Sequence, residues 1–406
     1  MIRTIRRSTA VLAVLVAAAA CNNDEISRPF LNTPVDPLFD RYVSMGNSIT
    51  AGFQSGGIND STQQQSYAVL LAHAMRSPFF VPSLTKPGCP PPYTNVFTGA
   101  RVPSPPGYPV SSGTTCFLRG IVASSPPPYV SNTAVPGAEV IDIFNNLDAT
   151  SHANQLTQII LGGLTQVQMM RRANPTFVSV WIGNNDVLGA ATNSANAGDS
   201  TLITPVATFQ TNYGNVVDSV EAAGPRGAVL IGVANVTAIP FFSRGSTYLG
   251  AKLANQLPPT MTVTANCAPP RGDSVLVPFT FGATLVGTAA AGAPTTLDCT
   301  EVQTVQPAEL VKLVTTVAAF NTFISAQATA HGWAYFDPNP SLDSLGTVAT
   351  AVRPFPLIGQ PCSANPFGTA FSCDGVHPSA ATHRLIAQKL RDAINAAYTT
   401  DIPPVP

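Results

Sequence analysis

The sequence predicts an α/β fold of three layers, in which helices cover both faces of a mostly parallel sheet. Short apolar runs with the form of buried strands alternate with helical segments along the chain. This alternation is typical of βαβ units, whose strands lie parallel. The chain also has 406 residues, which is enough to bury a substantial core.

Five segments predict a five-stranded sheet, and they lie near residues 42, 130, 178, 230 and 334. The run at 176–182 carries β-branched and aromatic residues and ends at Gly183, which is the pattern of a buried parallel strand. The run at 228–233 has the same character and follows a turn rich in Gly.

Helices are expected between these strands, because apolar residues recur there at helical spacing. The expected helices cover 66–75, 141–147, 151–172, 204–223 and 307–331. A final helix is expected from Pro378 to about residue 398, since Pro is favoured at the first helical position.

Three stretches rich in Pro and Gly interrupt this pattern, at about 78–128, 236–300 and 338–372. We interpret them as insertions in a single domain that spans 41–400. Residues 1–20 are then a signal peptide and 21–40 a polar tether. Long insertions of this kind often cover binding sites.

The charge balance argues against nucleic acid as a partner. Lys and Arg together number 20 and Asp and Glu number 21, so the net charge is −1. Such a composition offers no electrostatic attraction to nucleic acid or to an acidic membrane surface. We therefore expect no nucleic-acid partner, and a membrane contact only through a lipid anchor.

The first residues have the form of an export signal. Three arginines within residues 3–7 precede an uninterrupted run of Ala, Val and Leu at 10–20, and Cys21 follows. The run is too short to cross a bilayer, which takes roughly 20 residues. It resembles a bacterial lipoprotein signal, in which Cys21 is acylated, although Ala18 stands where Leu is usual. We expect export and a lipid anchor in the bacterial envelope; the alternative is ordinary secretion, with Cys21 left free or removed.

The other cysteines favour disulfides. Of the seven cysteines, six remain without Cys21, and an even number in an exported chain is typical of a disulfide framework. They fall into three consecutive pairs, and the predicted disulfides are Cys89–Cys116, Cys267–Cys299 and Cys362–Cys373. Zinc is the competing interpretation, but the sequence has no C-x-x-C, so we expect no metal.

The stretch at 42–52 offers a candidate nucleophile. It starts as an apolar strand, breaks at Gly46 and presents the hydroxyl of Ser48. In open α/β folds, ligands bind at the carboxyl ends of the strands, where this serine is expected. A serine acts as a nucleophile only when a base and an oxyanion hole reach it.

His377 is the candidate base among the five histidines. Pro378 disfavours a helical conformation at His377, which places it in the turn before the last helix. Asp374 lies three residues earlier across a Gly turn, close enough to accept a hydrogen bond from one imidazole nitrogen and leave the other free as a base. The alternative is that Asp374 only caps the helix.

Two further segments offer donors for an oxyanion. Residues 183–186 follow the strand at 176–182 directly, so Asn185 is expected at the same edge of the sheet. Residues 132–137 follow another expected strand, and Gly137 allows its backbone N–H to approach a ligand closely. The alternative is ordinary turn chemistry, since Asn and Gly dominate turns.

The order of these segments resembles the SGNH (GDSL-type) hydrolase family of esterases and lipases. The matching residues are Gly46-Asn47-Ser48-Ile49, Asn132 to Gly137, Gly183-Asn184-Asn185-Asp186 and Asp374 to His377. Two residues of the first block depart from the family pattern: this chain has Asn47 where the family usually has Asp, and Ile49 where it usually has Leu. The chain has no G-x-S-x-G, the pattern of the ordinary α/β-hydrolase elbow.

The resemblance implies a flavodoxin-like sheet and a Ser-His-Asp triad. Ser48 would be the nucleophile, His377 the base and Asp374 the residue that orients it. The oxyanion hole would consist of the Ser48 and Gly137 N–H groups and the Asn185 side chain. No metal or organic cofactor is implied.

The expected activity is hydrolysis of a carboxylic ester, with a small-molecule ester or an acylated lipid or glycan as substrate. Two alternatives remain. The same residues could transfer an acyl group to a sugar hydroxyl, or the chain could be a non-catalytic surface binding protein that uses its insertions. The second is disfavoured because all of the expected site residues are present.

Overall fold

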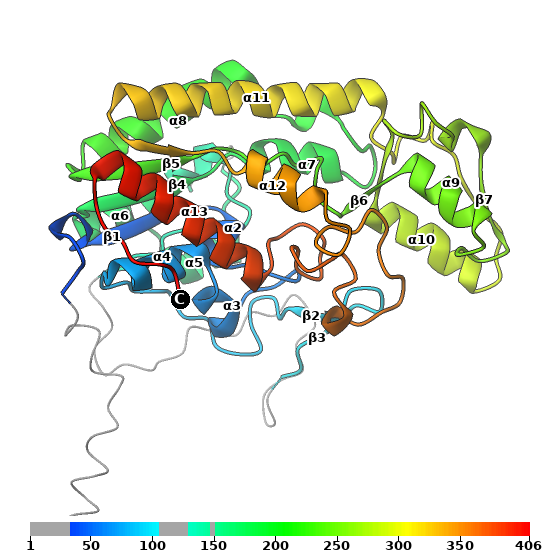
Figure 1. The fold of residues 1–406 in the computed structure, drawn as a ribbon, viewed down its shortest axis with the longest axis horizontal. Coiled ribbons are helices and arrows are strands. Elements are labelled where there is room, and N and C mark those ends of the chain that lie inside the picture. The colour runs from blue at the N-terminus through cyan, green and yellow to red at the C-terminus, as the bar shows by residue number, and fades with distance from the viewer. Residues whose placement is uncertain (1–32, 105–128, 147–150) are drawn as a thin grey trace, which may run out of the picture.

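A computed structural model describes residues 33–104, 129–146 and 151–406; the expected signal peptide, Cys21 and Cys116 lie outside these ranges. The centre of the fold is a parallel sheet in the order β1-β4-β5-β10 (Figure 1). Its strands are β1 (Tyr42–Gly46), β4 (Phe177–Trp181), β5 (Gly227–Ile231) and β10 (Ala334–Phe336). The prediction of a mostly parallel α/β fold is confirmed.

The prediction of a fifth strand near residue 130 is wrong. In the described chain the central sheet has four strands, and Asn132 forms only an isolated parallel bridge with Ser44 of β1. The Asn132 side chain accepts a hydrogen bond from the Ala134 N–H at 3.2 Å, which turns the chain. Pro136 has no N–H to continue a ladder. The segment therefore runs beside β1 without extending the sheet.

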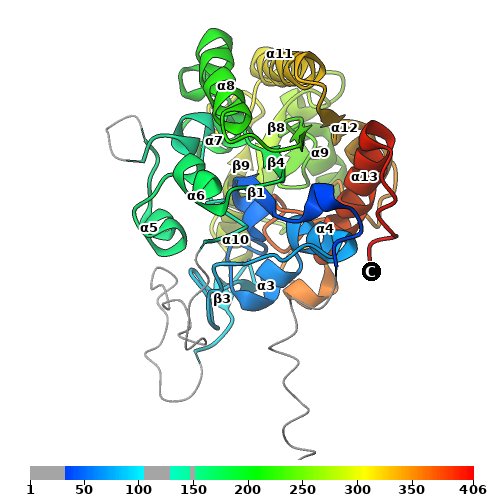
Figure 2. The same cartoon turned by 90° about the vertical axis from the view of Figure 1, so that its left-hand side faces the viewer.

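Helices cover both faces of the sheet, as expected (Figure 2). On one face lie α4 (Tyr67–Met75) and α13 (Ala380–Tyr398). The other face is covered by α6 (Gln166–Ala173), α8 (Val206–Glu221) and α11 (Pro307–Ala330). The residues of each strand alternate between the two cores, which is the pattern that a two-sided buried sheet requires.

Helix α11 is the one described helix that is long and apolar enough to cross a membrane by length and composition. It is amphipathic in the fold, and it buries one stripe of side chains against α8, β5 and β10. Phe320 of α11 stacks on Phe209 of α8, with ring centroids 3.6 Å apart. Helix α11 therefore packs on the domain through one face only.

Two predicted helices differ in their bounds. The helix expected at 151–172 is split into α5 (Gln155–Leu161) and α6, because Gly162 ends α5 in the left-handed region and Thr165 caps α6. The last helix begins at Ala380 rather than Pro378, since the Ser379 hydroxyl accepts the Thr382 N–H and acts as its N-cap.

The second insertion forms a small unit with its own core, at the right of Figure 1. The Cys267–Cys299 disulfide joins the middle of this unit to its C-terminal end, and this pairing was predicted. Its elements are β6 (Phe242–Arg244), α9 (Gly245–Leu253), β7 (Met261–Val263), η5 (Ala265–Cys267), β8 (Leu276–Pro278), α10 (Phe279–Ala290) and β9 (Thr295–Leu297).

The other two insertions also contain short regular elements. The first contains β2 (Tyr93–Asn95) and β3 (Ala100–Arg101), and its Cys89 is disulfide-bonded; the predicted partner, Cys116, is outside the described residues. The third contains α12 (Asn339–Gly346) and η6 (Cys362–Ala364), and the Cys362–Cys373 disulfide is confirmed. The remaining short elements are η2 (Pro37–Phe39), α2 (Ser48–Ala51), α3 (Asp60–Gln64), η3 (Val140–Ile143), α7 (Asn185–Thr192) and η4 (Ser200–Leu202).

Candidate active site

Ser48 is the first residue of α2, and only Asn47 separates it from the end of β1. The turn between them depends on Gly46, because a Cβ there would lie 2.4 Å from Thr50 Oγ1 and 2.5 Å from the Trp181 carbonyl. The buried side chain of Gln166 holds both backbone groups of Gly46: its Oε1 accepts from the N–H and its Nε2 donates to the carbonyl, each at 2.9 Å. The sequence offered no sign of this glutamine's role.

Asn47 caps the helix that carries Ser48. Its side-chain oxygen accepts the Ile49 N–H at 3.1 Å, and its amide nitrogen donates to the Asn184 side chain at 3.4 Å. The residue is buried. An uncharged amide fits this place because it both accepts and donates, whereas a carboxylate accepts only. This accounts for the departure at position 47 from the family pattern.

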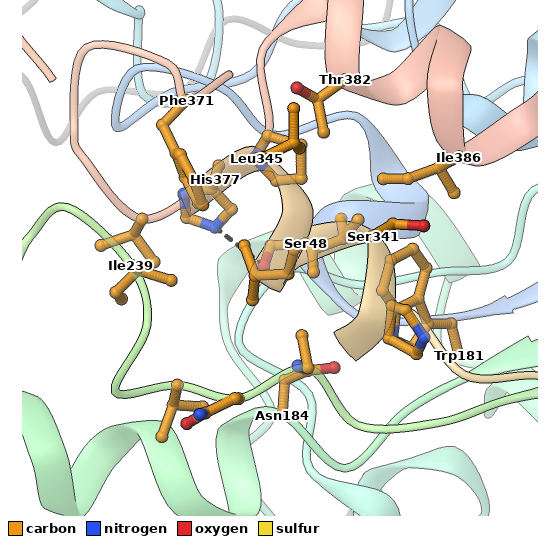
Figure 3. Close-up of a pocket in the computed structure, with 18 of the residues that line it drawn as sticks. Ser48, Trp181, Asn184, Ile239, Ser341, Leu345, Phe371, His377, Thr382 and Ile386 are labelled. Carbon is orange, nitrogen blue, oxygen red and sulfur yellow. Dashed lines mark hydrogen bonds between the residues drawn. The ribbon is translucent and has the colours of Figure 1, made fainter. Parts of the chain in front are cut away.

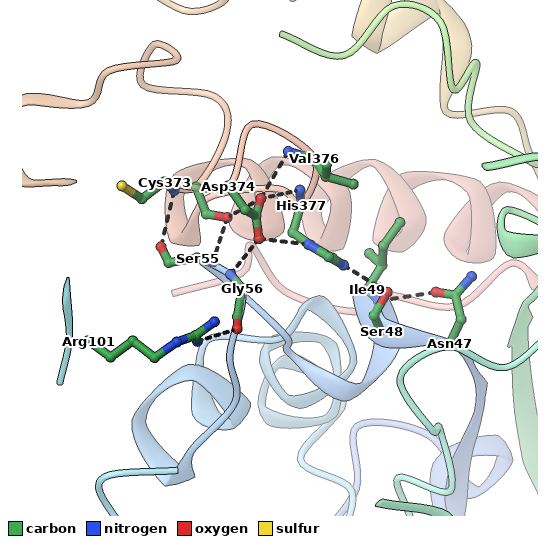
Figure 4. A network of polar contacts seen from close by, with 11 residues as sticks. Asn47, Ser48, Ile49, Ser55, Gly56, Arg101, Cys373, Asp374, Val376 and His377 are labelled. Carbon is green, nitrogen blue, oxygen red and sulfur yellow. Dashed lines mark hydrogen bonds and ion pairs between the residues drawn. The ribbon is translucent and has the colours of Figure 1, made fainter. Parts of the chain in front are cut away.

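The structure brings Ser48, His377 and Asp374 together. His377 Nε2 lies 2.9 Å from Ser48 Oγ, and His377 Nδ1 lies 2.8 Å from Asp374 Oδ2 (Figure 4). The ring of Phe53 packs against the imidazole, with centroids 4.9 Å apart. Both ring nitrogens of His377 are therefore engaged, one by an acid and one by the hydroxyl.

Asp374 is held by more hydrogen bonds than the histidine alone supplies. Its Oδ1 accepts from the Val376 and His377 N–H groups, each at 2.9 Å, and from the Ser372 hydroxyl at 3.1 Å. Its Oδ2 also accepts the Gly56 N–H at 2.6 Å. Burial alone would raise the pKa of Asp374, but the charge of His377 and these hydrogen bonds outweigh it and lower the pKa to about 2. The carboxylate is therefore ionised at neutral pH.

Two serines join the nucleophile segment to the histidine segment. The Ser55 N–H donates to Ser372 Oγ at 2.8 Å, and the Cys373 N–H donates to Ser55 Oγ at 3.1 Å. Arg101 of the first insertion donates to the Gly56 carbonyl at 2.8 Å (Figure 4). These residues are far apart in the sequence and form no motif, so the sequence alone does not reveal their contacts.

The candidate oxyanion donors differ in their surroundings. Asn185, the first residue of α7, lines the pocket beside Ser48, and one of its amide hydrogens is used by the Ala138 carbonyl at 2.8 Å. Gly137 is the neighbour of Ala138 and does not line that pocket. Its φ of +87° is in the left-handed region that favours glycine. Among the described residues, the backbone N–H groups of Ser48 and Gly137 have no hydrogen-bond partner.

An apolar pocket with a cavity volume of about 90 Å³ opens beside Ser48 (Figure 3). Its lining comes from the segments that follow β4, β5 and β10, and from α12 and α13. Aliphatic and aromatic side chains dominate this lining: Ile49, Trp181, Leu188, Val236, Ile239, Phe336, Leu342, Leu345, Phe371, Val376, Leu385 and Ile386. A serine, its histidine and an apolar cavity thus share one edge of the sheet.

A family model described as GDSL-like Lipase/Acylhydrolase matches residues 42–390. The chain belongs to this family. The match covers β1 to α13, so it includes every residue of the site described above. The chain is therefore a GDSL-family hydrolase, from a family of lipases and acylhydrolases that act on esters.

Overall similarity to other known proteins is low. No curated protein sequence matches the chain. An acetylxylan esterase from Geobacillus stearothermophilus, solved as a catalytic mutant, is 12% identical with a TM-score of 0.39, over 87% of this chain and 94% of that one. A putative GDSL-like lipase from Parabacteroides merdae is 11% identical with a TM-score of 0.38, over 89% and 99%. Values this low say nothing about substrate, so the family assignment rests on the sequence match.

Behind the oxyanion segment of this GDSL-family chain lies a buried acidic group. Burial and the charge of Glu139 raise the pKa of Asp186 to about 7, and burial and the charge of Asp142 raise the pKa of Glu139 to about 7. Asp186 Oδ2 accepts the Val140 N–H at 3.0 Å, and Asp142 faces His152, with Oδ2 and Nδ1 3.3 Å apart. In the part of the chain that the structure describes, no cluster of three or more His, Cys, Asp or Glu side chains could hold a metal ion. No sequence motif links Glu139, Asp142 and His152.

His383 is the histidine closest in sequence to the site, and it is a packing residue. It is fully buried, and its Nδ1 accepts the Tyr67 N–H at 3.3 Å. Burial, with a smaller contribution from the charge of His377, lowers the pKa of His383 to about 3. The imidazole is therefore neutral and fixed between α4 and α13.

Proposed function

We propose that this chain is a serine hydrolase of carboxylic esters in which Ser48, His377 and Asp374 form the catalytic triad. One observation supports this most directly: Asp374 and His377 are joined by a hydrogen bond of 2.8 Å, His377 and Ser48 by one of 2.9 Å, and Ser48 and His377 line a pocket. A base within hydrogen-bond reach of the hydroxyl is the geometry that nucleophilic catalysis requires.

In the first half of the reaction, Ser48 Oγ attacks the carbonyl carbon of the ester while His377 Nε2 takes the hydroxyl proton. The bond between that carbon and the alcohol oxygen then breaks, and the alcohol leaves with the proton from His377. The ionised Asp374 stabilises the imidazolium and holds its tautomer. An acyl group remains on Ser48.

In the second half, water replaces the alcohol. His377 takes a proton from the water, the resulting oxygen nucleophile attacks the acyl carbon, and the bond to Ser48 Oγ breaks. The proton returns from His377 to Ser48, and the carboxylic acid leaves. In both halves, the negative oxygen is held by the unpaired N–H groups of Ser48 and Gly137 and by the second amide hydrogen of Asn185.

The direct test is Ser48→Ala, assayed on p-nitrophenyl acetate. We expect turnover to fall to the background rate, with the circular dichroism spectrum and melting temperature close to those of the wild type. A fluorophosphonate probe should label the wild type and not the variant. Turnover by Ser48→Ala at the wild-type rate would rule out the proposed mechanism, and absence of labelling of the wild type would favour a non-catalytic binding protein.

We also propose that the protein is exported and anchored by a lipid on Cys21. The two disulfides in the described residues support an oxidising compartment. Metabolic labelling with a fatty acid in a bacterial host should mark the wild type, and Cys21→Ser should abolish the label. Equal labelling of both proteins would rule out the anchor.

A further inference from the structure

The pocket beside Ser48 extends along α13. Thr382, Ile386 and Lys389 all line it, and their spacing places them on successive turns of one face of the helix. At a rise of 1.5 Å per residue, the distance along α13 from Thr382 to Lys389 is about 10 Å. Ile386 is buried, Thr382 is half-buried and Lys389 is exposed.

Ser48 separates this part of the pocket from His377. In Figure 3, Trp181, Ser341 and Ile386 lie on the side of Ser48 away from His377, whereas Ile239 lies on the side of the histidine. The leaving alcohol oxygen has to lie near His377 Nε2, because that nitrogen supplies its proton. The acyl part of the ester then extends to the other side, along α13.

The chemistry of this arm fits an alkyl chain. Trp181 and Phe336 from the strand ends and Leu385 and Ile386 from α13 present apolar surface. Helix α12 borders the same pocket with Ser341 and Leu342 and has no fully buried residue of its own, so its apolar side chains are only half-covered. An acetyl group would leave most of this surface uncovered, whereas a longer chain would bury it.

We propose that this arm is an acyl-chain site and that the preferred substrates are esters of unbranched, medium-length fatty acids. Ser341 of α12 and Ile386 of α13 face the chain and set its length. Each methylene that enters an apolar site favours binding by about fourfold. This inference rests on the proposed ester hydrolysis and adds the substrate class to it.

The test is the chain-length profile of p-nitrophenyl esters, from acetate through octanoate to palmitate. For the wild type, we expect kcat/KM for octanoate to exceed that for acetate by at least about tenfold. Ser341→Trp and Ile386→Trp should each reduce this ratio by at least about tenfold, because the indole occupies the arm. Arg384→Trp is the matched control: it is exposed on the same helix, does not line the pocket and should leave the ratio unchanged.

A second series separates the acyl arm from the alcohol side. With ethyl acetate and octyl acetate, the Trp variants should leave the ratio of the two rates as it is in the wild type. Ser341 is half-exposed, so Ser341→Trp provides the test if Ile386→Trp does not fold, as judged by its melting temperature.

Two results would overturn the proposal while leaving the hydrolase function intact. One is a wild type that prefers acetate in a reaction abolished by Ser48→Ala. The other is a Trp variant that changes the alcohol series and leaves the acyl series unchanged. Full turnover by Ser48→Ala would instead overturn the proposed function, and the acyl-chain site with it.

Discussion

The two sides of Ser48 differ in what holds them in place. On the side of His377, Asp374 alone accepts five hydrogen bonds, and they come from Gly56, Ser372, Val376 and His377, the last through both its backbone and its ring. On the other side, the pocket is lined mainly by apolar side chains from five separate parts of the chain. Directional bonds fix a geometry, whereas apolar contacts fix mainly a volume.

Within this one site, the polar side around His377 is expected to control the reaction rate, and the apolar side is expected to control substrate selectivity. Positioning of the base has to be accurate, because a small displacement of a catalytic group has a large effect on the rate. An apolar pocket tolerates substitutions of similar volume. We therefore expect changes on the polar side to lower kcat for every ester, and changes on the apolar side to alter the order of substrates.

The largest effect is expected from Asp374→Asn. The amide keeps the size of the side chain but loses the charge that stabilises the imidazolium and selects its tautomer, so kcat should fall by about 10⁴-fold. Steady-state assays on the same p-nitrophenyl ester measure this loss of kcat, and Asp401→Asn, at an exposed position, is the control. A loss of less than tenfold in a folded variant would show that Asp374 is not the orienting acid.

The next effect is expected from Asn185→Ala. Removal of one oxyanion donor lowers kcat by about 10²–10³-fold, with a much smaller change in KM. The variant also loses the hydrogen bond to the Ala138 carbonyl, so its melting temperature has to be measured beside its activity. An increase in KM with kcat unchanged would mean that Asn185 only binds substrate.

The polar side is also the part of the site that the sequence predicts well. Asp374 and His377 are three residues apart, and Pro378 places the histidine outside the helix. The contact between the two side chains therefore depends on one short segment of the sequence. Ser48 follows a strand and a required glycine, which is again local. The strand at β4 was predicted because its β-branched run is long and bounded by clear turn residues.

The remaining features depend on contacts that a single segment does not encode. Ser55 and Ser372 are 317 residues apart, and isolated serines form no pattern. The lining of the pocket is not readable from the sequence, because α12 lies in a stretch rich in Pro and Gly that indicates only an insertion. The prediction of a strand near Asn132 is wrong for a related reason. The apolar residues of this segment are buried beside β1, but a side-chain hydrogen bond turns the chain.

The unfolding free energy should depend on pH through Asp374. Its pKa is about 2 in the folded protein and 3.8 as an ordinary value, so the folded state favours the carboxylate. The stabilisation of about 2 kcal/mol is complete above pH 4 and is lost as the pH falls from about 4 to about 2. The side chain at this position of the Asp374→Asn variant cannot titrate. As the pH falls over this range, the unfolding free energy measured in urea should therefore decrease more for the wild type than for the variant. A constant difference would contradict the lowered pKa.

The smallest effect is expected from Ser372→Ala, which tests whether the polar side depends on its outer contacts. The variant removes one hydrogen bond to Asp374 and the acceptor of the Ser55 N–H. A hydrogen bond to an ionised carboxylate contributes about 1.5 kcal/mol or more, so kcat should fall by about tenfold with KM unchanged. Ser372→Thr keeps the hydroxyl and should recover most of the loss, while Ser344→Ala, at an exposed position of α12, should have no effect. If Ser372→Ala lowers the melting temperature but leaves kcat unchanged, the five-bond support of Asp374 exceeds what catalysis needs, and the two sides of Ser48 differ less in function than in structure.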